Sequence, residues 1–143
     1  MKASFRFKTL AAVIGAAALT CSALHAHEKD KGKAASLPQA KSAEEAWSNA
    51  QTAFKAIQTA ASAQKFEAIH DEQEKLAGWL KQVQEKGTAS DKARFDGAVK
   101  NAIAASDRVH VAADLKDAGK VDSSVRVLEA SMAMVERQLA VAK

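Results

Sequence analysis

The sequence KFEAIHDEQEKLAGWLKQV, which spans residues 65–83, has the clearest helical pattern in the chain. Its apolar positions recur three and four residues apart, which is the spacing of one face of an α-helix. The predicted buried face comprises Phe66, Ile69, Gln73, Leu76, Leu80 and Val83. We therefore expect this stretch to form one wall of a helical bundle.

Three further amphipathic helices are predicted around this stretch. From Ser42 onward the chain is rich in alanine, lysine, glutamate and glutamine and contains no proline, which is typical of helices. Ser42 and Glu45 have the spacing of a capping box, which begins a helix. The buried faces would be Trp47, Ala50, Phe54, Ile57 and Ala61 in the first helix; Phe95, Val99, Ala102, Ile103, Ser106, Val109 and Ala113 in the third; and Val121, Val125, Leu128, Met132, Val135 and Leu139 in the fourth.

Short connections are predicted between these helices. The apolar stripes before and after residues 61–64 are displaced by about 200° around a helix axis, so we expect a turn there instead of one long helix. We expect Gly87 to end the second helix as a left-handed cap. Residues 116–122 would form the last turn, in which Gly119 ends the third helix and Asp122 is the N-cap of the fourth. Thr88, Ser90 and Asp91 are candidate caps for the third helix.

The expected fold class is therefore all-α. Helices of about twenty residues with short connections make antiparallel neighbours, so residues 42–142 are predicted to form an up-down-up-down antiparallel four-helix bundle. Strand signals are absent from the sequence, since its β-branched residues are scattered among alanines.

Residues 1–26 have the organisation of a cleaved signal peptide. Lys2, Arg6 and Lys8 precede a short apolar run over residues 10–19, and small residues follow it. We expect cleavage after Ala26 and a periplasmic or secreted protein. The alternative is a lipoprotein, with the lipid attached to the single cysteine, Cys21.

Removal of the signal peptide changes the charge and the chemistry of the chain. The net charge falls from +4 to +1, because three basic residues and no acidic residue leave with it. We therefore expect no nucleic-acid partner, and no transmembrane span after processing. The mature chain would contain no cysteine, which excludes disulfides, thiolate metal sites and cysteine catalysis.

Residues 27–41 are charged and contain the only proline, which predicts a flexible leader. After cleavage, His27 would carry the terminal amine. That amine and the imidazole together form a candidate secondary site for copper or nickel.

The export signal, the four amphipathic helices and the turn LKDAGKVDSS at residues 115–124 resemble the small periplasmic four-helix bundles, among them the soluble b-type cytochromes. The likeness covers most of residues 42–142 in pattern and one short turn in detail. In those cytochromes a methionine from the first helix and a histidine near the end of the last hold the haem iron. Here the first helix has no methionine, and Leu139 or a neighbour stands where the histidine would be. The resemblance therefore implies the scaffold without the family's haem ligands.

Two histidines inside the predicted bundle are the candidate metal ligands. His70 follows the first turn by about six residues and His110 precedes the last turn by about eight, so both imidazoles should lie at one level on neighbouring helices. A carboxylate precedes each by three residues, Glu67 and Asp107, and this spacing puts both groups on one helix face. The predicted site is therefore His70, His110, Glu67 and Asp107 with copper, nickel or zinc.

We interpret the protein as a non-enzymatic exported binding protein, accessory to periplasmic divalent-metal handling or envelope stress. No catalytic spacing or phosphate-binding loop occurs in the sequence. A di-metal site lacks ligands, because at the level of the histidines the first helix offers Lys55 and Gln58 and the fourth offers Glu129 at best. One alternative is a structural or partner-binding module that docks near Trp79, with both histidines as boundary residues that bind nothing. Another is a non-covalent haem protein in which His70 and His110 are the axial ligands.

Overall fold

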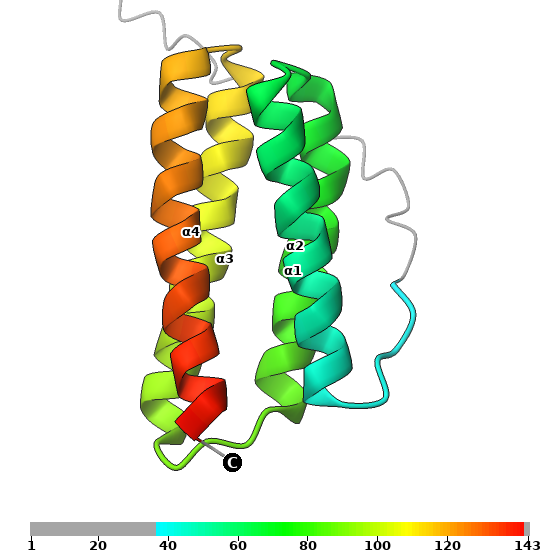
Figure 1. Cartoon of the computed structure of the whole chain (residues 1–143), viewed down its shortest axis with the longest axis vertical. Helices are drawn as coiled ribbons and strands as arrows, with labels where there is room; N and C mark the ends of the chain where they lie inside the picture. Colours follow the sequence, from blue (N-terminus) through cyan, green and yellow to red (C-terminus); the bar gives the residue numbers. More distant parts are fainter. Residues whose placement is uncertain (1–36, 142–143) are drawn as a thin grey trace, which may run out of the picture. The chain divides into compact units, whose positions relative to one another are not determined.

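The structure, a computed structural model, describes residues 37–141, with side chains for residues 37–139. Its four helices are α1 (Ala43–Ser62), α2 (Phe66–Lys86), α3 (Lys92–Asp114) and α4 (Ala118–Val141). They pack as an antiparallel bundle, which confirms the predicted fold (Figure 1). The predicted signal peptide, Cys21 and His27 lie outside the described residues.

The bundle consists of two helical hairpins. Helix α1 packs most extensively against α2, and α3 packs most extensively against α4. The hairpins meet mainly through α2 and α3, whereas α1 and α4 touch least. Both tight hairpin turns lie at one end, shown at the top of Figure 1, and the longer α2–α3 connection lies at the other. None of the described helices is long and apolar enough to cross a membrane.

The two hairpin turns have the same backbone geometry. Gln64 and Lys116 adopt φ angles of 54° and 51°, in the left-handed region that follows many helix ends. In the first turn, the Lys65 amide donates to the Ala60 carbonyl at 2.8 Å. This turn confirms the predicted break between α1 and α2.

The second turn is shorter than predicted. It comprises Leu115, Lys116 and Asp117, so Gly119 and Asp122 lie inside α4 and do not form a stop and a cap. The carboxylate of Asp117 caps α4 instead and accepts a hydrogen bond from the Lys120 amide at 3.0 Å. This hydrogen bond lowers the pKa of Asp117, because it stabilises the charged carboxylate.

At the other helix ends, two predicted N-caps are confirmed and one predicted C-cap is wrong. Ser42 Oγ caps α1 by accepting from the Glu45 amide at 3.2 Å, and Asp91 caps α3 by accepting from the Arg94 amide at 3.0 Å. The left-handed cap predicted at Gly87 is wrong, because its φ is −72°. A Cβ atom at Gly87 would lie 2.6 Å from the ring of Phe95, so glycine permits this close approach.

The core follows the predicted faces of α2, α3 and α4 closely, but the face of α1 is different. Trp47 and Phe54 are only partly buried and cover the edge of the core. The residues of α1 that enter the core are Ala46, Ala50, Ala53, Ile57 and Ala60. Small alanine side chains let α1 approach its neighbours closely, which moves the bulkier aromatic residues to the boundary.

The last residues before α1 pack against α2, which differs from the flexible leader expected up to residue 41. Gln82 is buried; its Oε1 accepts from the Ala40 amide at 2.7 Å and its Nε2 donates to the Pro38 carbonyl at 3.0 Å. A Cβ atom built on Gly78 would lie 2.4 Å from Leu37 Cδ1, so this glycine leaves room for Leu37. The packed unit thus includes Leu37–Lys41.

Candidate metal centre

Two histidines meet across the α2–α3 interface, at the end of the bundle that carries the tight turns. His70 is the fifth residue of α2, and His110 is the fifth residue from the end of α3. Their Nδ1 atoms are 3.1 Å apart, and their rings meet edge to face with centroids 4.3 Å apart. The expectation that both imidazoles lie at one level is confirmed.

Asp114 completes the cluster. Its Oδ1 lies 3.2 Å from His70 Nε2, and its Oδ2 lies 3.5 Å from His110 Nε2, so one carboxylate spans both rings. One ligand atom from each of the three residues lies within 4.8 Å of the other two. A single cation bound between them can therefore contact all three groups after small side-chain adjustments.

The backbone positions these side chains through the buried residues beside them. Ile69 and Val109 are fully buried and anchor α2 and α3 next to the two histidines. Asp114 follows His110 by four residues, which puts both on the same face of α3. Asp114 is also the last residue of α3, where the carbonyl ends of the helix favour a positive charge.

The cluster lies at the boundary between core and solvent. The exposed side-chain fractions are 16% for His110, 31% for His70 and 52% for Asp114. Ions can therefore reach the carboxylate from solvent, while the imidazoles are held by the helices around them.

The two carboxylates expected from the sequence lie elsewhere. Glu67 is almost fully exposed, and its Oε1 is 4.0 Å from the Lys116 ammonium. Asp107 accepts a hydrogen bond from Gln73 Nε2 at 2.9 Å. The structure thus brings together His70 and His110 from the predicted set, with Asp114 in place of Glu67 and Asp107.

A buried polar contact supports the histidine pair one turn further into the bundle. Gln73 Nε2 also donates to Ser106 Oγ at 3.2 Å, and Ser106 Oγ donates to the Ile103 carbonyl at 2.8 Å. Gln73 and Ser106 are both buried, so leaving either group without its hydrogen bond would be costly. This contact holds α2 and α3 in the register that aligns the histidines.

Asp114 is not among the ligands predicted from the sequence, although the sequence contains a signal for it. His110 and Asp114 have the i, i+4 spacing of side-chain neighbours on a helix, as good as the i−3 spacing that selected Asp107. The tertiary structure decides which of the two carboxylates lies beside the histidines. Asp114 ends α3 next to the start of α2, whereas Asp107 lies one turn further into the bundle beside Gln73.

The other predicted site residues find less support in the geometry. Trp79 is 8% exposed and belongs to the core, which leaves little of its side chain to contact a partner. The two imidazoles touch directly, whereas axial ligands of a haem iron approach it from opposite faces of the porphyrin. This contact gives the haem alternative no support.

Comparisons of the chain with protein-family models, with curated proteins and with solved structures find no match. The described part of the chain is a four-helix all-α bundle, and its site must be interpreted from its own residues.

Proposed function

We propose that this protein binds one divalent transition-metal ion through His70, His110 and Asp114. The observation that carries the proposal is the convergence of two imidazoles and a carboxylate, with ligand atoms within 4.8 Å of one another. The site is formed by two helices of different hairpins, so its geometry depends on the folded bundle.

The donor set favours zinc, copper or nickel. Imidazole nitrogen suits these ions, whereas calcium and magnesium prefer sites made entirely of oxygen ligands. Three protein ligands leave a fourth position for water or for a ligand from another molecule. An open, partly exposed site of this kind supports reversible binding better than a closed structural role.

The close approach of the three groups also favours a cation. Three close contacts join the two rings and the carboxylate, at 3.1 Å between the imidazoles and at 3.2 and 3.5 Å to Asp114. Each neutral imidazole has one nitrogen lone pair that can bind a metal ion. A divalent cation bound between the three groups would accept lone pairs from both imidazoles and from the carboxylate at once.

The biological role that we propose is a non-enzymatic one outside the cytoplasm, accessory to the handling of divalent metals or to envelope stress. The predicted signal peptide supports the compartment, and the open coordination position supports exchange of the ion with other molecules. The resemblance to periplasmic cytochromes supports only the four-helix scaffold and not the binding of haem.

Thermal unfolding of the purified protein, without a histidine tag, tests the proposal. Zinc, copper or nickel at about 100 times its Kd should raise the Tm by about 10 °C, because the ion binds the folded state only. The effect should disappear in the His70→Ala, His110→Ala double variant and persist in Glu67→Gln. A shift that survives the double variant and disappears in His27→Ala would assign binding to the predicted secondary site instead.

A further inference from the structure

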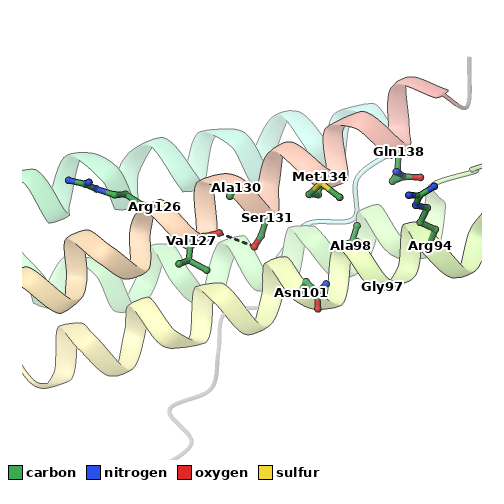
Figure 2. Close-up of a pocket in the computed structure, with 10 residues that line it drawn as sticks. All are labelled: Arg94, Gly97, Ala98, Asn101, Arg126, Val127, Ala130, Ser131, Met134 and Gln138. Carbon is green, nitrogen blue, oxygen red and sulfur yellow. Dashed lines mark hydrogen bonds between the residues drawn. The ribbon is translucent and has the colours of Figure 1, made fainter.

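A groove separate from the metal centre runs along the outer surface of α3 and α4 (Figure 2). Its volume is about 590 Å³, which lies within the range of about 300–1,000 Å³ typical of small-molecule sites. Between Arg126 and Gln138 on α4 it extends for about 18 Å at 1.5 Å per residue. Its length suits one extended chain better than a compact ligand.

The middle of the groove is mostly apolar. Val127 and Met134 are 47% and 42% exposed, which is high for large apolar side chains. They lie two turns apart on α4, with Ala130 between them and Ala98 on the facing part of α3. An alkyl chain bound here would remove these apolar surfaces from water.

Glycine at position 97 leaves the floor of the groove open. A Cβ atom built on Gly97 would have no heavy atom within 4 Å, so packing does not require glycine there. A larger side chain at this position would project into the open space without displacing the core. Gly97 therefore offers a way to block the groove while keeping the fold.

An arginine lies at each end of the groove. Arg94 lies with Gln138 at one end and Arg126 lies at the other, while the described lining contains no acidic residue (Figure 2). Arg126 is paired with Asp122 at 2.8 Å. Arg94 makes no ion pair within the described residues, so its guanidinium is available to an anionic group.

We propose that this groove binds a single-chain anionic amphiphile, with the acidic head group on Arg94 and Gln138 and the alkyl chain along Met134 and Val127. The positive charge of Arg94 favours a negatively charged head group. The apolar middle of the groove favours an alkyl chain. The guanidinium of Arg94 can bind a carboxylate or a phosphate through two parallel hydrogen bonds, and the Gln138 amide can add a third.

Calorimetric titration below the micelle concentration tests this proposal. Dodecanoate and dodecyl phosphate should bind one molecule per chain, and whichever binds more tightly identifies the preferred head group. Dodecyltrimethylammonium should bind at least tenfold more weakly. Within the carboxylate series, each added methylene should tighten binding by about twofold to fourfold until the groove is full.

Matched variants distinguish the groove from general surface adsorption. Gly97→Leu should abolish binding, and Gly97→Ala should largely keep it. Arg94→Gln should weaken carboxylate binding by about tenfold, whereas removal of an exposed charge outside the groove, in Lys100→Gln, should not. Equal binding of both head-group charges, or unchanged binding in Gly97→Leu, would overturn the proposal. Dimerisation that Gly97→Leu abolishes, without amphiphile binding, would also overturn it and assign the groove to a second copy.

Discussion

His70 and His110 lie with their Nδ1 atoms 3.1 Å apart, although 40 residues separate them in the chain. The contact joins the first hairpin to the second near the ends that carry the tight turns. The chain itself connects α2 to α3 at the opposite end, through residues 87–91. With a metal ion bound here, the two hairpins would be linked at both ends, by the ion at one end and by the chain at the other.

Substitution of a single ligand should weaken metal binding strongly. We expect His70→Ala, His110→Ala and Asp114→Asn each to raise the Kd for zinc by at least tenfold, because loss of a direct ligand should exceed the about 10- to 100-fold effects of outer-shell changes. Isothermal titration calorimetry gives the Kd and the stoichiometry. Glu67→Gln is the matched control, since this exposed carboxylate is near the site but outside it; an equal loss in this variant would assign Glu67 to the site.

Metal binding should also stabilise the α2–α3 interface locally. We expect slower amide hydrogen exchange in the first turns of α2 and the last turns of α3, because opening of this interface would break metal bonds. Exchange measured by mass spectrometry with and without zinc should show little change in the loop at residues 87–91. Calorimetric binding without local protection would show that the ion binds but does not link the hairpins.

Two glycines inside helices should respond to substitution with opposite signs. Gly97→Ala should raise the free energy of unfolding by about 0.5–1 kcal/mol, because alanine favours the helix and meets open space. Gly78→Ala should lower it or displace Leu37, because its Cβ would lie 2.4 Å from that side chain. Urea unfolding of both variants measures the difference. Stabilisation by both substitutions would show that Leu37 does not pack on α2.

The Asp117 cap should contribute stability that depends on pH. Its pKa is lowered from the ordinary value of 3.8 in the folded protein by the Lys120 amide. The contribution is therefore present above the unfolded pKa and is lost as the pH falls through the lower folded pKa. Asp117→Ala should be less stable than the natural protein near pH 7, and the difference should shrink as the pH falls below the unfolded pKa and through the lower folded pKa. A constant difference from pH 7 to pH 2 would contradict this account.

Most of the fold could be predicted because helical periodicity is local information. The stripe from Ile69 to Val83 identifies the buried face of α2, and the phase change after Ala61 locates the first turn. The face of α1 was predicted less well, because periodicity ranks Trp47 and Phe54 above alanine. Close helix packing instead puts the alanines in the core.

The candidate site could be predicted only in part. Helix rise and antiparallel topology suffice to bring His70 and His110 to one level. Selection of the carboxylate depends on where α3 ends and on the neighbours of each acid, which are tertiary facts. The contact of Ala40 with Gln82 is likewise invisible to local patterns, since it joins residues 42 positions apart.

A crystal structure of the zinc-soaked protein, with anomalous data collected at the zinc edge, tests the central claim most directly. We expect one strong anomalous peak between His70, His110 and Asp114, with zinc–nitrogen distances of about 2.0–2.1 Å. The same crystal form of the His70→Ala, His110→Ala variant should lose that peak. A well-ordered structure with zinc bound elsewhere, or with no peak between these three side chains at saturating zinc, would contradict the account.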